Sequence, residues 1–245
     1  MMHVVSKGRA LPLAWQVRQG KKGHCPEALH SALVKQVHTL IPLGASVVGR
    51  GDGEFEGTTL QHTLQDYHGS YVVGTGSPIL VLGDGERFRC ETVAACLKPG
   101  TLVALTAVRV TEAAYGPVRL LCGWATGYHE PRHLLTHLAA ADQACRLEAQ
   151  RFRIATVVSA QPSRGFHRHR SHLSDPTRRS RWLMAACFAS MWSIDLGALC
   201  EQDGWISMLQ RGDRCALSVF QLGLRLLEYL LNEDRAMPVA FYVTI

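Results

Sequence analysis

The order of the expected elements predicts an α/β fold that is interrupted by a β-rich insertion and followed by helices. Strand and helix patterns alternate over residues 1–69, and short β-rich runs separated by Gly and Pro fill residues 70–136. Helical patterns return over residues 137–245. Hydrophobic residues make up 47% of the chain and charged residues 19%, which is typical of a globular protein and excludes a disordered one.

The first segment contains a hairpin, two helices and a buried strand. Apolar residues alternate on both sides of a turn at residues 7–9, which predicts a hairpin over residues 1–17. Leu and Val recur at helical spacing over residues 26–40, and a second helix is expected over residues 57–66. Between them, the apolar run at residues 45–49 predicts a short buried strand.

The later segments are predicted from the same patterns. Strands are expected at residues 71–73, 79–82, 87–90, 102–110 and 118–124. The sequence Gly83-Asp84-Gly85 predicts a hairpin turn. Helices are expected at residues 139–159, 180–199 and 217–231. The sequence Ser174-Asp175-Pro176 is typical of a helix N-cap with Pro in the first turn.

Neither a membrane span nor a secreted protein is predicted. The longest apolar run, residues 182–199, contains Ser190, Ser193 and Asp195, so a buried core helix explains it better than a membrane-spanning one. The eight cysteines form no CxxC pair, and the N-terminus has no apolar signal-peptide region, which favours a reducing cytoplasm. Sequence motifs for nucleotide hydrolysis and serine hydrolase chemistry are absent.

Asp52 is the first candidate for a functional residue. It follows the strand expected at residues 45–49, and α/β folds place active groups at the carboxyl ends of their strands. Glu54 and Glu56 add negative charge nearby, and a hard cation such as Mg²⁺ prefers oxygen ligands. The alternative interpretation is that Asp52 only caps a turn between Gly51 and Gly53.

Positive charge is concentrated in residues 164–181. This segment has six Arg and a single acid, Asp175, and so supplies five of the six net positive charges of the chain. Its Arg, His and hydroxyl side chains can contact phosphates, although a solvated basic loop would have the same composition. A second alternative is metal binding by the three histidines of this segment, His167, His169 and His172.

Three stretches of the chain together resemble bacterial insertion-sequence transposases of the DDE class, the family with a Tyr, Arg, Glu and Lys motif on a helix. The stretches are residues 7–15 (KGRALPLAW), residues 51–55 (GDGEF), and residues 163–176 with the later FQLGL at 220–224. The resemblance implies a ribonuclease-H-like core with the β-rich insertion, and Mg²⁺-dependent cleavage and transfer of DNA strands during transposition and recombination. It also implies that Asp52 is a metal-binding catalytic carboxylate.

The same resemblance predicts that catalysis is lost in this chain. The four motif positions fall on Glu148, Arg151, Ala155 and Pro162, so only the Arg is retained. An Ala methyl cannot ligate Mg²⁺, and Pro162 carries no charge. The family's first Asp is expected before residues 7–15, where this sequence has none, so the chain is expected to be truncated at its N-terminus.

The expected partner is double-stranded DNA at transposon ends, in the cytoplasm of a bacterium. The expected DNA-binding residues are Arg151, Arg164, Arg168, Arg170, Arg178 and Arg179. Three hypotheses remain open: an inactive transposase, a DNA-binding remnant that inhibits an intact transposase, and a misfolded gene fragment with an exposed sheet edge. Pairing with an intact transposase or with a second copy of the chain is also expected, and membrane association is not.

Overall fold

The computed structural model describes residues 1–6, 9–19, 25–150, 173–209 and 217–238, and the chain divides into two compact units. The first unit comprises residues 1–16 and 20–158, and the second comprises residues 17–19 and 159–245. Each unit has its own hydrophobic core. The first unit mixes strands and helices, as the sequence predicts, whereas the described elements of the second unit are helices.

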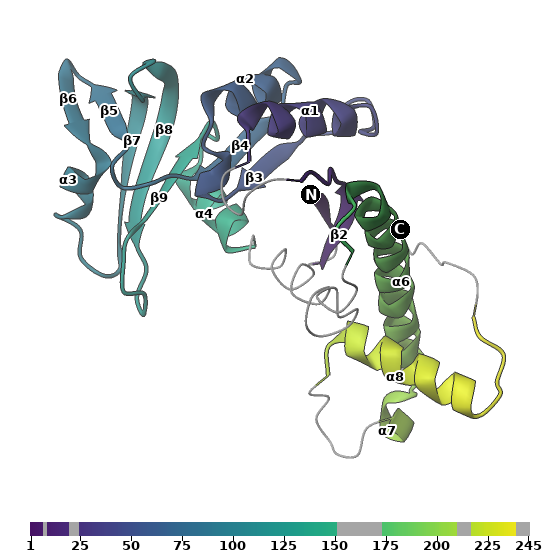
Figure 1. Cartoon of the computed structure of the whole chain (residues 1–245). Helices are drawn as coiled ribbons and strands as arrows, with labels where there is room; N and C mark the ends of the chain where they lie inside the picture. The colour runs from purple at the N-terminus through teal and green to yellow at the C-terminus, as the bar shows by residue number, and fades with distance from the viewer. Residues whose placement is uncertain (7–8, 20–24, 151–172, 210–216, 239–245) are drawn as a thin grey trace. The chain divides into compact units, whose positions relative to one another are not determined.

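A seven-stranded mixed sheet organises the first unit (Figure 1). Its strands, in spatial order, are β3 (Val48–Gly51), β4 (Ser70–Gly74), β9 (Arg132–Thr136), β8 (Tyr115–Trp124), β7 (Thr101–Val110), β5 (Leu80–Gly83) and β6 (Glu86–Arg89). β3 and β4 are parallel, and the other neighbouring strands are antiparallel. The strand expected in the first segment and the strands of the expected insertion therefore share one continuous sheet.

Helices cover both faces of this sheet. Alternate residues of the central strands face opposite sides, so Tyr71, Leu120 and Leu135 enter the larger core while Val72 and Leu121 enter a second, smaller one. The larger core also receives side chains from α1 (Glu27–His38), α2 (Thr58–Asp66) and α3 (Cys90–Ala94). The smaller core is closed by α4 (Ala141–Ala149).

Most predicted elements of the first unit are confirmed, with three differences. The strand expected at residues 45–49 lies later in the chain, as β3 at Val48–Gly51. The hairpin is present as β1 (Met2–Ser6) and β2 (Arg9–Ala14), which pair antiparallel. Cys90 begins the short helix α3, although the sequence pattern predicts that it ends a strand. β9 is not among the predicted strands because its last four residues are all buried, as expected for a strand covered on both faces, so its apolar residues do not alternate.

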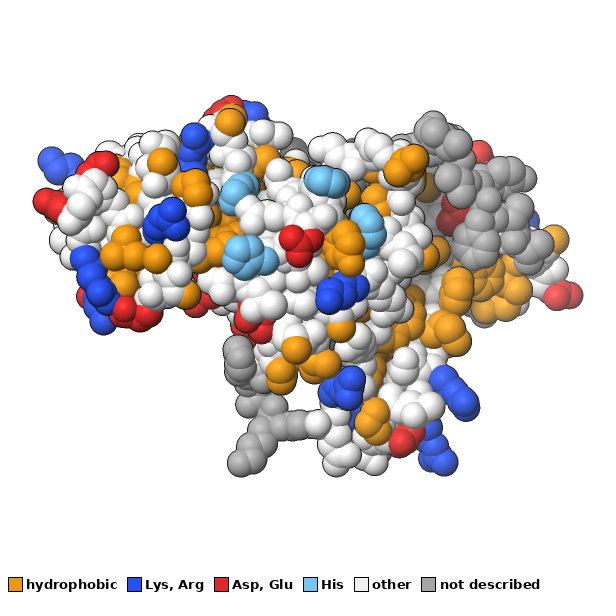
Figure 2. Space-filling view, turned by 90° about the horizontal axis from the view of Figure 1, so that it is seen from above, with side chains coloured by type: hydrophobic (Ala, Val, Ile, Leu, Met, Phe, Trp, Pro, Cys, Tyr) orange, Lys and Arg blue, Asp and Glu red, His pale blue; other side chains and the backbone are white. Residues whose placement is uncertain are grey.

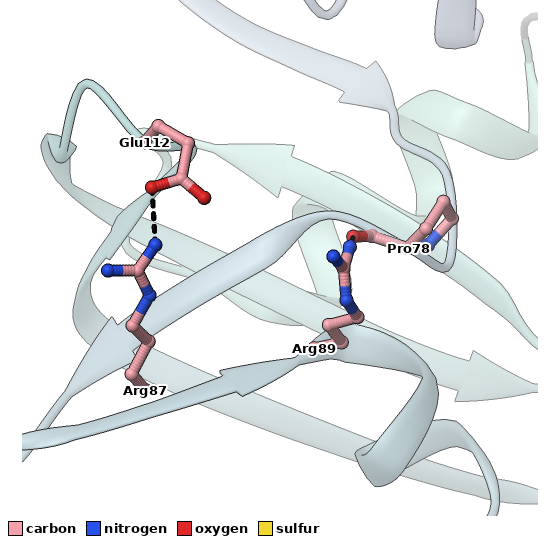
Figure 3. Close-up of polar contacts among 4 residues, drawn as sticks. All are labelled: Pro78, Arg87, Arg89 and Glu112. Carbon is pink, nitrogen blue, oxygen red and sulfur yellow. Dashed lines mark hydrogen bonds and ion pairs between the residues drawn. The ribbon is translucent and has the colours of Figure 1, made fainter.

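The hairpin formed by β5 and β6 lies at one edge of the sheet. Its turn at Asp84 and Gly85 has φ values of 50° and 80°, the left-handed pair that a tight hairpin turn requires, which confirms the predicted turn. Arg87 of β6 forms an ion pair with Glu112, and Arg89 Nη1 donates a hydrogen bond to the carbonyl oxygen of Pro78 at 2.7 Å (Figure 3). Because both members of the ion pair are exposed, it contributes little to stability.

The second unit is built on two helices in close contact. α6 (Pro176–Gln202) is capped by Asp175, whose side chain accepts a hydrogen bond from the backbone N–H of Arg178 at 2.7 Å, as the sequence predicts. α8 (Val219–Asn232) begins with a reciprocal capping box between Ser218 and Gln221. The core formed by these helices also receives Ile206 from the short helix α7 (Ile206–Leu209).

Two glycines permit the close approach of α6 and α8. A Cβ atom at Gly197 would lie 1.8 Å from the carbonyl oxygen of Val219, and one at Gly223 would lie 1.7 Å from that of Ser193. No side chain fits at either distance. Gly223 belongs to the FQLGL stretch of the sequence, so part of that motif serves helix packing.

Of the helices in the described residues, only α6 is long and apolar enough to cross a membrane by length and composition. Core helices of soluble proteins share these properties, and Leu196 and Cys200 of α6 are fully buried against residues of α8 such as Leu222. This packing is consistent with the core helix that the sequence predicts.

We expect Gly223→Ala to destabilise the second unit, because the added methyl group collides with the Ser193 carbonyl and must push α6 and α8 apart. A loss of about 1–3 kcal/mol in the free energy of unfolding is expected, as for other overpacked cores. Urea unfolding followed by circular dichroism measures it. Gly53→Ala is the control, because a Cβ atom there meets no atom within 4 Å. Equal unfolding free energies for the two variants would contradict this packing.

Candidate functional site

A cleft of about 550 Å³ opens at one end of the sheet, where β3 and β4 end and β9 begins. Ligands of α/β proteins commonly bind in such a crevice, outside the carboxyl ends of the strands. The cleft is lined by Asp52, Gly53, Gly74, Thr75, Ser77, Ala94, Glu130, Pro131, Arg132, His133, Leu134 and Glu148.

Asp52 lies immediately after β3, at the place predicted from the sequence. Its side chain is exposed and accepts a hydrogen bond from the backbone N–H of Glu54 at 3.2 Å, which caps a single turn of 3₁₀ helix at Gly53–Phe55. The structure thus contains the turn cap that was the alternative interpretation of this residue. The same carboxylate also lines the cleft, so capping does not remove it from the candidate site.

The backbone around Asp52 packs closely at two neighbouring glycines. A Cβ atom at Gly51 would lie 2.6 Å from Cβ of Phe55. One at Gly74, on the adjacent strand, would lie 3.3 Å from the backbone nitrogen of Gly53. These contacts hold the turn against the end of β4 and fix the position of Asp52 in the cleft.

Glu56 connects the 3₁₀ turn at Gly53–Phe55 to the residues that follow β4. Its Oε2 accepts hydrogen bonds from Thr75 Oγ1 at 2.5 Å and from the backbone N–H of Gly76 at 3.2 Å. Thr75 lines the cleft, so the Glu56 carboxylate holds the rim in place. Its role is therefore structural, whereas the sequence suggested a contribution to a metal site.

Glu148 of α4 lines the same cleft as Asp52 and is buried. Arg50 of β3 holds this end of the helix by donating hydrogen bonds from Nη1 to the carbonyl oxygen of Leu147 at 3.1 Å and to Oε1 of Gln150 at 3.2 Å. Burial lowers the pKa of the Arg50 guanidinium, and the neighbouring Glu148 carboxylate opposes this shift. A cation at the carboxyl end of α4 also complements the helix dipole.

The described residues of the cleft do not assemble the carboxylate centre that the resemblance implies. Three acids, Asp52, Glu130 and Glu148, line it together with a single arginine, Arg132. No three of these acids bring their oxygens within 4.8 Å of one another; across the described ranges, only Cys90, Cys122 and His133 form such a compact group. The described acids therefore do not form a compact three-carboxylate group.

The expected DNA-binding residues are only partly described. Arg178 and Arg179 lie in the first turn of α6, in the second unit. Arg178 is exposed, and Arg179 is partly buried, with its Nε donating a hydrogen bond to the carbonyl oxygen of Leu173. Outside the described residues lie Arg151, Arg164, Arg168 and Arg170, the motif positions Ala155 and Pro162, and the histidines His167, His169 and His172.

Histidine side chains gather on the face of the first unit that α1 and α2 cover (Figure 2). Among the histidines of α1 and α2, His38 stacks on Tyr67 with 3.9 Å between ring centroids, and His62 meets Tyr115 edge-on at 4.8 Å. None of them belongs to a converging metal-ligand group among the residues described. This histidine surface is therefore explained by aromatic packing.

The converging group of Cys90, Cys122 and His133 was not predicted from the sequence. All three residues are buried in the first unit. Hydrogen bonding to Cys122, together with burial, raises the pKa of the Cys90 thiol, whereas the hydrogen bond from Cys90 lowers the pKa of Cys122. The three positions are 32 and 11 residues apart, so no spacing motif identifies them.

We expect Glu56→Ala to destabilise the rim of the cleft, because the two donors at residues 75 and 76 lose their charged acceptor. Hydrogen bonds to charged groups contribute roughly 1.5–3 kcal/mol each, and solvent access at Glu56 reduces that figure. Hydrogen exchange of the Gly76 amide and urea unfolding measure the effect. Glu54→Ala, which removes an exposed carboxylate from the same turn, is the control and should change neither.

No protein-family model matches the chain, and no curated protein matches it. The resemblance stated above therefore rests on the three sequence stretches that carry it.

Proposed function

We propose that the chain is a transposase-derived protein that binds double-stranded DNA without cutting it. The observation that carries this proposal is the uneven distribution of charge along the chain. Positive charge is concentrated in residues 164–181, whereas the cleft at the end of the sheet has three acids and one arginine. In the DDE transposases that the chain resembles, metal ions held by such a cleft would attract the DNA backbone.

The acidic cleft is unsuited to hold DNA by itself. Asp52, Glu130 and Glu148 repel phosphates unless cations neutralise them, and they do not form a compact group of three oxygens within 4.8 Å of one another. Ala155 stands where the resemblance expects the ligating Glu, and an Ala methyl donates no electron pair. We therefore expect no strand cleavage, because the cleft lacks the groups that would activate water or stabilise the leaving oxygen.

The start of α6 supports binding of the DNA backbone. Arg178 and Arg181 are exposed and lie three residues apart, so they occupy one side of the helix. The N-terminus of this helix is already capped by the Asp175 carboxylate, so the two arginine side chains are the groups that would contact phosphates. Binding of this kind is independent of base sequence. Where it covers transposon ends, the bound chain would compete with an intact transposase for them.

We expect the variant Arg178→Ala/Arg181→Ala to bind a labelled DNA duplex more weakly than the unmodified chain at low salt. Each lost phosphate contact should reduce the slope of log affinity against log salt by about 1. Fluorescence anisotropy across a salt series measures both quantities. The control, Arg87→Ala, removes an exposed arginine from β6 in the first unit. Equal slopes for both variants would contradict a role of α6 in binding.

We expect no nicked or linear product when the chain is incubated with supercoiled plasmid in Mg²⁺ or Mn²⁺, because the carboxylates do not form a two-ion centre. Agarose gel electrophoresis resolves the products. The Asp52→Asn variant separates true activity from a contaminating nuclease. Cleavage that disappears in this variant would show that the chain is an active transposase and would overturn the proposal that it does not cut DNA.

A further inference from the structure

The register of the sheet brings a cysteine and a histidine together on one face. Cys122 of β8 and His133 of β9 are directly opposite partners in an antiparallel pair. Directly opposite residues have their Cβ atoms roughly 4.5–5.5 Å apart and project from the same face. That face is the one covered by the larger core, to which Cys122 and its neighbour Leu120 belong.

A third potential ligand comes from a different part of the chain. α3 begins at Cys90 and packs against β8 in the same unit (Figure 1). This packing places Cys90 Sγ 3.4 Å from Cys122 Sγ. The ligand atoms of Cys90, Cys122 and His133 all lie within 4.8 Å of one another.

Burial makes this cluster chemically unusual. Both cysteines have no exposed surface, and His133 is 8% exposed. Nε2 of His133 is buried and has no hydrogen-bond partner within the described part of the chain. Leaving a buried polar atom without a partner is destabilising, and a metal ion bound at Nε2 would remove that cost.

The donor set selects the class of metal ion. Two sulfurs and one imidazole nitrogen suit Zn²⁺ and other thiophilic ions, whereas Mg²⁺ and Ca²⁺ require oxygen. With Zn–S bonds of about 2.3 Å, tetrahedral geometry separates two sulfurs by roughly 3.8 Å. The observed 3.4 Å separation of Cys90 and Cys122 therefore needs only a small opening to accept the ion.

We propose that Cys90, Cys122 and His133 form a zinc site that ties α3 to β8 and β9 beside the cleft. Zinc sites with three protein ligands take a water or another small ligand in the fourth position. His133 lines the cleft, which offers a source of this fourth ligand. The zinc site does not depend on DNA binding or on any catalytic role of Asp52.

The test is the zinc content of the full chain, purified without a polyhistidine tag and with a non-thiol reductant. We expect about one zinc ion per chain by mass spectrometry of the metal, and a large loss of zinc in the Cys122→Ser and His133→Gln variants. Cys96→Ser replaces an exposed cysteine near the end of α3 and should retain the metal. Zinc that is absent from the unmodified chain, or retained by Cys122→Ser, would overturn the proposal.

A second measurement on the unmodified chain covers the case in which a variant fails to fold. After removal of zinc, Co²⁺ should produce thiolate-to-cobalt charge-transfer absorption and the visible bands of tetrahedral coordination, with Cys96→Ser giving the same spectrum. Absence of these bands would contradict the site. Loss of two hydrogens from the intact mass, abolished by Cys122→Ser, would instead identify a disulfide between Cys90 and Cys122 and would equally overturn the zinc assignment.

Discussion

The register between β4, β9 and β8 is the constraint on which the first unit depends. Because side chains alternate between faces, this register decides that Tyr71, Leu120 and Leu135 meet in one core and that Val72 and Leu121 meet in the other. The ends of the same strands form the cleft. A shift of one residue would exchange the two faces, remove His133 from Cys122 and bury polar side chains without partners.

Charge is distributed unevenly along the chain. The cleft collects Asp52, Glu130 and Glu148 with Arg132, whereas the arginines of residues 164–181 supply most of the net positive charge. A phosphate backbone binds where cations are in excess, so the proposed DNA contact belongs to the basic segment. Asp52 retains its place at a strand end but is engaged in capping a turn, and Glu56 in holding the rim.

Features that depend on local chemistry could be predicted from the sequence, and features that depend on packing could not. The turn at Asp84 and Gly85 and the cap at Asp175 follow from neighbouring residues, and Asp52 was located correctly after its strand. The grouping of Cys90, Cys122 and His133 depends instead on strand register and on the packing of α3. The same holds for Gly197 and Gly223, whose need for close contact is visible only once α6 and α8 are paired. Arg151, Arg164, Arg168 and Arg170 lie outside the described residues, so their roles stay predictions.

The most direct test of the central claim is the affinity of the unmodified chain for a labelled DNA duplex, measured by fluorescence anisotropy across a salt series with and without Mg²⁺. The account predicts affinity that falls steeply with salt and that Mg²⁺ does not increase, because arginines rather than a metal centre contact the phosphates. Binding that requires Mg²⁺, or no binding at low salt, would contradict it.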